Sequence, residues 1–361
     1  MSKLIPHKTL ISGIKKLIDE ARKQVVRNVN TTMLVTNFEI GRMIVEYEQK
    51  GRQRAEYAKE TLKTLSQSLT AEFGKGYSVD NLEYCRKFYL TYNISDTASR
   101  KSTQQKSGTA SRNSDKNSGI STYETLSRNS NLSFELTWSH YVQLLKIQDE
   151  KERSFYQIEA IENNWSVREF ARQHSSGLYE RLALSRNKKG IKELAKKGQV
   201  IQQPVDALKS HYVLEFLNLK EDHRYSETEL ETAIIDKLEH FMLELGKGFL
   251  FEGRQRRFTF EGDSFFVDLV FYNRLLKCFV IIDLKIGKLT HQDIGQMQMY
   301  VNYYDRMMKT TDENPTIGII LCREENKTVV EFTLPKTNNQ IFTKEYKHYL
   351  PSKAELQKQL Q

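Results

Sequence analysis

Two carboxylates and a lysine interrupt consecutive apolar segments near residue 280. Asp268 lies within the run 265–272, and Asp283 and Lys285 lie in the next apolar run. Runs that are apolar on both faces are typical of central strands in a covered sheet, where a lone Asp has no structural reason to be present. If residues 274–277 form a hairpin turn, Asp268 and Asp283 lie opposite each other with Cβ atoms about 5 Å apart. Lys285 then points to the same face as Asp283.

This cluster predicts chemistry on phosphodiesters. Two ionised carboxylates at such a distance repel each other, and a shared divalent cation relieves the repulsion. The cation would acidify a water molecule and polarise a phosphate, while Lys285 would orient that water or neutralise the developing charge. The pattern Asp-x-Lys is common by chance, so the prediction depends on its position within consecutive apolar strands. We therefore expect a metal-dependent hydrolase that uses Mg²⁺ or Mn²⁺.

The segments around this cluster predict a helix, three strands, a helix and a strand. Ser226 and Glu229 form a capping box, and the helix that they begin should end at Gly246. The expected strands are 249–260, 264–272 and 277–284. A second helix, 290–308, and a strand, 316–322, follow. The C-terminal half should therefore be an α/β domain with the order αβββαβ.

Glu231 and the pair Gln296 and Tyr300 are further candidates for the site. Glu231 shares its expected helix face with apolar positions only, which are Ile234, Ile235, Leu238, Phe241, Met242 and Leu245. A carboxylate there either binds a metal or a partner, or reaches water at the first turn of the helix. Gln296 and Tyr300 are four residues apart and share a helix face. The alternative for this pair is that Tyr300 packs in the core and Gln296 is an ordinary surface residue.

The N-terminal half is expected to be helical. Apolar spacing predicts helices over 10–47 and 54–73, and Gly74 and Gly76 form a turn before a third helix that Ser78 caps. The second and third of these helices, with the glycine turn between them, resemble a helix-turn-helix unit that reads DNA. Ordinary packed helices are also joined in this way. We expect four parts: a helical region, 1–95; a flexible Ser-rich linker with three near-identical repeats, 96–132; a helical region with a basic connector, 133–204; and the α/β domain, 205–361.

Charge and composition indicate the partner and the compartment. The 361 residues carry a formal net charge of +9, which favours a polyanion. No basic amphipathic helix with Trp or Phe on its apolar face stands out, so nucleic acid is preferred to a membrane surface. No apolar run reaches the roughly 18 residues of a membrane span. The start of the chain lacks the pattern of a secretory signal, and three distant cysteines predict no disulfide framework, so we expect a cytoplasmic protein.

These motifs resemble the PD-(D/E)XK nuclease superfamily, and more narrowly the YhcG-type bacterial proteins. The segments that carry the resemblance are Phe73-Gly-Lys-Gly-Tyr77, Trp138-Ser-His140, Trp165-Ser-Val-Arg-Glu169, Gly253-Arg-Gln255, Asp268-Leu-Val-Phe-Tyr272, Asp283-Leu-Lys-Ile-Gly-Lys288 and Gly295-Gln296. The resemblance implies a helix-turn-helix or winged-helix-like N-terminal region that binds DNA. It also implies a restriction-endonuclease-like domain, possible homodimers, and partner proteins of a DNA-processing system.

The resemblance also assigns roles to the candidate residues. Asp268 matches the first metal-binding acid, Asp283 the second and Lys285 the family's lysine, and the backbone carbonyl of Leu284 is expected to join the metal ligands. Gln296 and Tyr300 match a Q-x-x-x-Y signature, and Glu231 matches the acid that some members carry on the first helix. The chain departs from the family in having Asp283 where Glu is more frequent, and in a longer linker.

The sequence therefore predicts a metal-dependent nuclease, with DNA as the expected substrate. The alternative from another class is a catalytically inactive protein that binds nucleic acid or assembles a complex on a nuclease fold. A purely structural interaction protein is a third reading, and it leaves the positive charge and the paired carboxylates unexplained.

Overall fold

The computed structural model describes residues 5–50, 55–100, 134–186, 188–219 and 225–360. The chain divides into two compact units, Met1–Arg153 and Ser154–Gln361. The division falls within helix α6 (Glu150–Glu162), so the predicted helical region 133–204 is divided between the two units. The expected linker, 96–132, lies outside the described residues from position 101 onward, and so do most of its three repeats.

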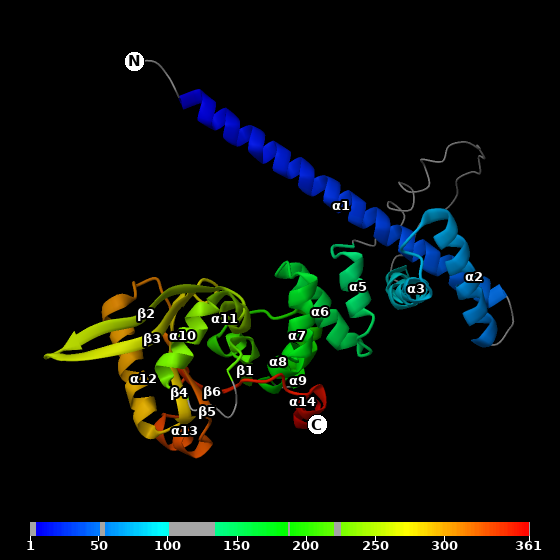
Figure 1. The fold of residues 1–361 in the computed structure, drawn as a ribbon. Coiled ribbons are helices and arrows are strands. Elements are labelled where there is room, and N and C mark those ends of the chain that lie inside the picture. The colour runs from blue at the N-terminus through cyan, green and yellow to red at the C-terminus, as the bar shows by residue number, and fades with distance from the viewer. Residues whose placement is uncertain (1–4, 51–54, 101–133, 187, 220–224, 361) are drawn as a thin grey trace. The chain divides into compact units, whose positions relative to one another are not determined.

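The first unit is helical, as the sequence predicts. Its helices are α1 (Ile5–Lys50), α2 (Ala55–Phe73), α3 (Val79–Arg100) and α5 (Trp138–Leu144) (Figure 1). Ser78 caps α3, because its Oγ accepts a hydrogen bond from the backbone N–H of Asn81 at 3.2 Å. Helix α3 continues to Arg100, past the expected start of the linker at residue 96, since neither Gly nor Pro interrupts it. Within the described part of this unit there is no strand, and hence no β-wing.

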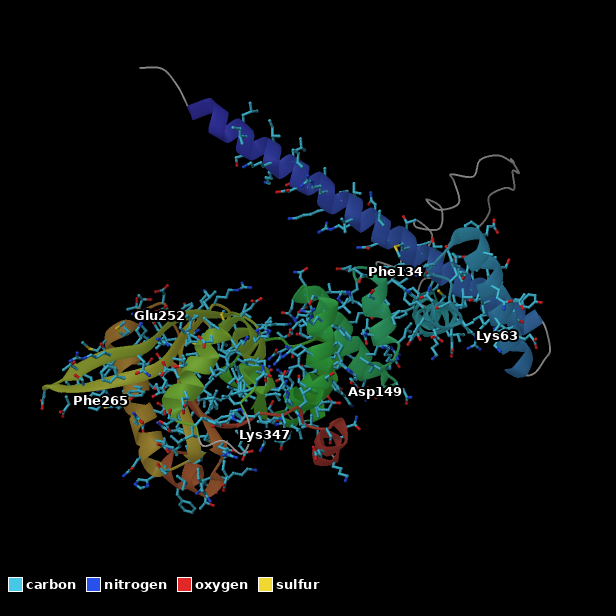
Figure 2. The ribbon with its side chains drawn as sticks, viewed as in Figure 1. Lys63, Phe134, Asp149, Glu252, Phe265 and Lys347 are labelled. Carbon is cyan, nitrogen blue, oxygen red and sulfur yellow. The ribbon has the colours of Figure 1, made fainter. Side chains whose placement is uncertain are left out.

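Close helix packing and an aromatic cluster stabilise the first unit. A Cβ atom at Gly41 of α1 would lie 2.0 Å from the carbonyl oxygen of Cys85 in α3, so only glycine permits this approach. Phe88 of α3 is fully buried, and its ring lies 5.1 Å from that of Phe134 and 5.0 Å from that of Tyr141 (Figure 2 labels Phe134). These rings join α3 to α5.

The second unit contains a six-stranded sheet in the order β1-β6-β5-β4-β3-β2. The strands are β1 (His211–Val213), β2 (Phe249–Phe260), β3 (Asp263–Asn273), β4 (Cys278–Lys288), β5 (Ile317–Glu324) and β6 (Ile341–Lys347). Strands β2, β3 and β4 are antiparallel, and β5 lies parallel to β4. The expected αβββαβ core is therefore confirmed. The sequence analysis missed β1 and β6, which extend the sheet beyond β5.

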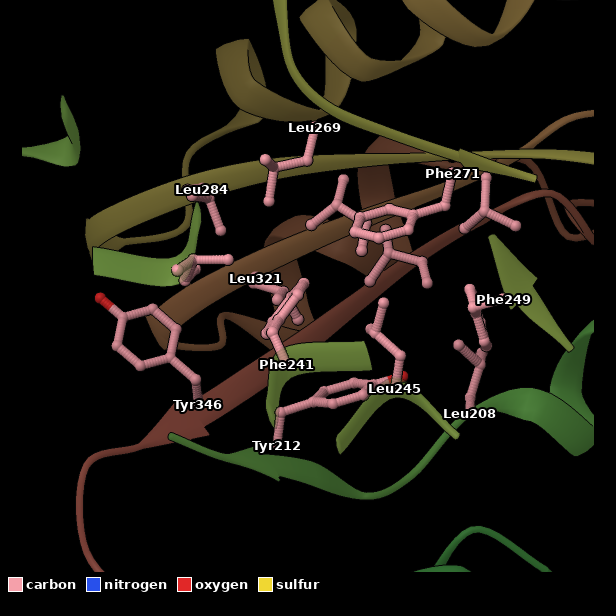
Figure 3. Packing of buried hydrophobic residues seen from close by; sticks show 14 of the residues in the cluster. Leu208, Tyr212, Phe241, Leu245, Phe249, Leu269, Phe271, Leu284, Leu321 and Tyr346 are labelled. Atoms are coloured by element: carbon pink, nitrogen blue, oxygen red, sulfur yellow. The ribbon is translucent and has the colours of Figure 1, made fainter. Parts of the chain in front are cut away.

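The second unit also contains helices, some of which cover the two faces of this sheet. Their bounds are α6 (Glu150–Glu162), α7 (Val167–Ser175), α8 (Leu178–Leu184), α9 (Lys188–Lys197), α10 (Glu227–Asp236), α11 (Leu238–Leu245), α12 (His291–Tyr303), α13 (Lys327–Thr333) and α14 (Lys353–Leu360), with short helical turns η1 (Pro204–Ala207), η2 (Glu215–Leu217) and η3 (Tyr304–Met308). Side chains of α10 and α11, such as Phe241, pack against Leu269, Phe271 and Leu284 of the sheet (Figure 3). Side chains of α12 pack on the other face, against Val267, Val270 and Ile281. Among the described residues, no helix has the length and apolarity that a membrane crossing requires.

One helix that the sequence predicts to be continuous is broken. The helix expected from Ser226 to Gly246 is interrupted at Lys237, between α10 and α11. A similar break separates α7 from α8, because Gly177 adopts a left-handed conformation with φ 63°. Apolar spacing reports which side chains are buried, and a break of one or two residues leaves that spacing almost unchanged.

A buried ion cluster lies in the second unit, where α11 meets α7 and α8. The Glu244 carboxylate is fully buried and pairs with Arg181 Nη1, with Arg172 Nη2 at 3.4 Å and with Lys209 Nζ at 3.7 Å. It also accepts a hydrogen bond from the backbone N–H of Val213 at 2.9 Å. Burial alone would raise the pKa of Glu244, but the three cations lower this pKa to about 2.

Candidate active site

The candidate site lies where β3 and β4 separate. Their backbone pairing ends at Leu269 and Ile282, and the next register position sets Asp268 opposite Asp283, as the sequence predicts. The Asp268 side chain fills the gap between the strands, because its Oδ2 accepts a hydrogen bond from the backbone N–H of Leu284 at 2.9 Å.

Asp283 is almost completely buried, with 1% of its surface exposed. Burial, and then the charge of Asp268, raise the pKa of Asp283 to about 7. Burial also raises the pKa of Asp268, although the hydrogen bond from Leu284 opposes this shift. The two carboxylates are therefore costly to ionise together in the absence of a cation.

Lys285 is the cation that faces this pair. Its Nζ lies 3.0 Å from Asp283 Oδ2 and 3.7 Å from an oxygen of Glu227, the first residue of α10. Although burial lowers the pKa of Lys285, the charge of Asp283 outweighs burial and raises this pKa above its ordinary value. Lys285 therefore keeps its proton at neutral pH and acts as a hydrogen-bond donor and a positive charge.

Glu231 joins the site through Gln255. The Nε2 atom of Gln255 lies 2.6 Å from Glu231 Oε2 and 3.3 Å from Asp268 Oδ1, so that one amide links α10 to β3. Gln255 has a φ of 48°, which is uncommon for a residue other than glycine. Glu231 is 6% exposed, and burial raises its pKa. Of the two readings of Glu231, the structure therefore supports the one in which it has a partner.

Gln296 and Tyr300 share a face of α12, as their spacing predicts. Gln296 Nε2 donates to the Tyr300 hydroxyl at 2.6 Å, and this hydroxyl donates to the carbonyl oxygen of Phe266 at 2.8 Å. Tyr300 is 1% exposed, and burial raises its pKa to about 12. The pair therefore fastens α12 to the segment of β3 that precedes Asp268, and Tyr300 is part of the core as well.

The residues present fit a divalent cation. Asp283 Oδ2 is buried, and its partner is the ammonium group of Lys285 in an ion pair, so it retains a lone pair for a ligand. Carboxylate oxygens are the ligands that Mg²⁺ prefers, and they usually act together with water and substrate oxygens. No group of three or more His, Cys, Asp or Glu side chains with metal-binding geometry occurs among the described residues. Asp268 and Asp283 lie where β3 and β4 separate, so their carboxylates are side chains that could hold the ion.

Sequence reasoning assigned no role to two residues that the structure brings into the site. Gln255 lies in a segment quoted only for its family likeness, and Glu227 is a cap residue of α10 that pairs with Lys285. The sequence around Gln255 does not predict its positive φ, because Arg254–Arg257 is an ordinary polar segment without glycine. The position of Glu227, four residues before Glu231 on one helix face, was the only available signal.

Comparisons with known proteins show which family the chain belongs to. Residues 205–361 match the family model described as "YhcG PDDEXK nuclease domain", and residues 13–181 match the "DUF1016 N-terminal domain". The chain is 40% identical over 351 residues to "Putative nuclease YhcG" of Escherichia coli (strain K12), covering 96% of this chain and 92% of that protein. The chain therefore belongs to the YhcG family and carries a PD-(D/E)XK nuclease domain of restriction-endonuclease-like fold.

Two solved structures also show partial similarity. A repair endonuclease from Pyrococcus abyssi is 16% identical, with a TM-score of 0.24 over 35% of this chain and 49% of that chain. An EndoMS complex with double-stranded DNA is 13% identical, with a TM-score of 0.26 over 37% of this chain and 51% of that chain. The chain thus spans about half the length of each. The fold assignment depends on the family match and the sheet topology rather than on these similarities.

Proposed function

We propose that the chain is a divalent-metal-dependent nuclease that hydrolyses phosphodiester bonds of DNA. The observation that carries the proposal is the buried pair of acids at the end of two separating strands, with Lys285 at 3.0 Å from Asp283. Such a pair destabilises the folded protein unless a cation occupies it, so its presence is explained by metal binding.

Each residue of the site has a distinct part in this proposal. Asp268, Asp283 and the backbone carbonyl of Leu284 would hold Mg²⁺ or Mn²⁺. When bound, the cation polarises the phosphate and acidifies water. Lys285 donates to the oxygens on which negative charge develops, and its raised pKa rules it out as a proton acceptor at neutral pH. Glu231 and Gln255 orient Asp268.

Tyr300 and Gln296 position the site and do not contact the substrate in this proposal. Their hydrogen bonds fix the carbonyl of Phe266, two residues before Asp268, and so restrict the position of that acid. A misplacement of about 1 Å can slow an enzymatic reaction by roughly a hundredfold, so this support matters for the rate.

We also propose that the positive charge of the chain brings it to DNA in the cytoplasm. The net charge of +9 favours a polyanion, and the lysines of α9 at positions 189, 192, 196 and 197 are exposed. The three cysteines are free and buried, which fits a reducing compartment. Affinity for DNA should then fall steeply between low and physiological salt.

The proposal is tested by offering the purified chain labelled single-stranded DNA, duplex DNA and RNA, each with Mg²⁺, with Mn²⁺ or with a chelator. We expect DNA to be cut only when metal is present. Cleavage in chelator would contradict the metal requirement, and preferential cleavage of RNA would contradict the substrate. If no substrate is cut under any condition, the alternative of an inactive nucleic-acid-binding protein is favoured.

A further inference from the structure

The outer half of the hairpin β2–β3 extends beyond the candidate site and carries an exposed arginine beside an exposed phenylalanine. Strands β2 and β3 pair up to Phe260 and Asp263, and the turn between them consists of Glu261 and Gly262 (Figure 1). Figure 2 shows Phe265 near the outer end of the hairpin and Glu252 nearer its base. Arg257 is paired with Phe266 across the two strands, so their side chains are neighbours.

The two faces of this hairpin have different surroundings. Phe258 turns toward α12, because its ring stacks on that of Tyr303 with centroids 4.1 Å apart, and Phe265 stacks on Phe258 at 5.5 Å. Side chains alternate along a strand, so the neighbouring Arg257 and Phe266 point to the opposite face. Gln255 also points there, since it binds Glu231 of α10. Arg257 and Phe266 therefore lie on the side of the hairpin that faces away from α12, which is the side on which Gln255 reaches Glu231 of α10.

Arg257 is held in place with its charge available. Its Nε and Nη2 atoms donate to Ser264 Oγ at 3.1 and 2.8 Å. No carboxylate among the described residues forms an ion pair with Arg257, whereas its neighbour Arg256 is paired with Glu252. A guanidinium positioned in this way, without an anion of its own, is suited to a phosphate.

Phe266 is 47% exposed and lies two residues before Asp268, roughly 7 Å along the strand. Its backbone is fixed, because its carbonyl accepts the hydrogen bond from Tyr300. An exposed ring on a fixed backbone, next to an arginine that has no anion of its own, is suited to stacking on a nucleobase. The bases of a duplex are stacked on each other, so the ring needs a base that is unpaired.

We propose that Arg257 and Phe266 form a binding site for an unpaired nucleotide next to the phosphate that is cut. The substrate is then single-stranded DNA, or DNA that has unpaired bases at the point of cleavage. Arg257 binds a phosphate of this strand, and Phe266 stacks on the adjoining base. The inference rests on the proposed nuclease function, because the position of the cut is set by Asp268 and Asp283.

The test measures binding and cleavage separately. Affinity is measured in the Asp283→Ala background, so that cutting does not interfere, for a single strand and for a duplex of the same sequence. Phe266→Ala should weaken binding of the single strand by about 5- to 150-fold, which corresponds to the stacking of one base, and leave duplex binding within about twofold. Phe266→Tyr should restore the affinity. Phe260→Ala is the matched control, because Phe260 is 42% exposed on the same hairpin but contacts Tyr303 on the other face.

A fluorescent base analogue next to the cleavage position provides a second readout. It should be quenched by the chain with Phe266 and not by the Phe266→Ala variant. In otherwise unchanged protein, Phe266→Ala and Arg257→Gln should slow cleavage of the single strand more than that of the duplex. Equal losses for both substrates, or an equal loss in Phe260→Ala, overturn the inference while the nuclease function stands. If Phe266→Ala selectively weakens binding of the single strand but no substrate is cut by the unchanged protein, the inference stands and the nuclease function is overturned.

Discussion

Replacing Asp283 by Asn should stabilise the metal-free protein. Asp283 has a pKa of about 7 against an ordinary value of 3.8, so the folded state holds its proton more tightly than the unfolded state. Ionising Asp283 in the fold therefore costs free energy, and this cost grows as pH rises from about 4 to 7. A shift of about three pKa units corresponds to at most about 4 kcal/mol, since each unit is worth about 1.4 kcal/mol. This figure already includes the attraction to Lys285, which lowers the pKa of Asp283 and opposes the effect of burial.

Thermal unfolding with and without Mg²⁺ measures this effect. For a domain of this size, about 1 kcal/mol moves the melting temperature by about 2 to 4 °C. At pH 8 with a chelator, we expect Asp283→Asn to melt several degrees higher than the unchanged protein, and at pH 4 the two should coincide. Mg²⁺ should stabilise only the unchanged protein. Asp263→Asn, at the exposed hairpin turn, is the control. If Asp283→Asn melts several degrees lower at pH 8, Asp283 is a structural residue and the reasoning is refuted.

Three further predictions follow from the contacts. Gln255→Ala should lower the cleavage rate about 10- to 100-fold while the fold is kept, because Asp268 and Glu231 lose the amide that links them. Gln298, an exposed residue of α12, is the control, and a similar loss in Gln298→Ala would contradict this. Glu244→Gln should cost roughly 3 to 5 kcal/mol of unfolding free energy, because buried cations lose their anion. Since the folded pKa of Glu244 is lowered to about 2, its contribution is present above about pH 4.5 and is lost as pH falls toward 2, which acid unfolding measures. Gly41→Ala should destabilise the first unit, because the clash with Cys85 outweighs a gain in helix propensity of about 1 kcal/mol; an unchanged or higher melting temperature would show that α1 and α3 adjust.

The sequence predicted which residues come together at the centre of the candidate site, for a physical reason. Asp268 and Asp283 stand in runs that are otherwise apolar, and a buried carboxylate needs an explanation that few structures other than a metal site provide. The hairpin register then follows from the length of the turn between β3 and β4. Both predictions depend on local patterns, which a single sequence contains.

The remaining parts depend on long-range contacts that leave no local pattern. Glu244 lies on a helix face that reads as exposed, yet it is buried by cations from α7, α8 and the segment before β1. Gln255 reaches Glu231 with a backbone φ of 48°, a conformation that its residue type does not predict. Strand β1 has three residues and is a strand only because β6 pairs with it. Neither propensity nor spacing could have predicted these features.

The central claim is that Asp268 and Asp283 together hold a divalent cation that the nuclease needs. The most direct test measures, on the same preparations, Mn²⁺ binding by calorimetry and single-turnover cleavage of DNA in Asp268→Asn, Asp283→Asn and Lys285→Ala. We expect both Asp variants to lose metal binding and cleavage while keeping their affinity for DNA, and Lys285→Ala to bind metal but cut slowly. Cleavage at an undiminished rate in both Asp variants would contradict the account.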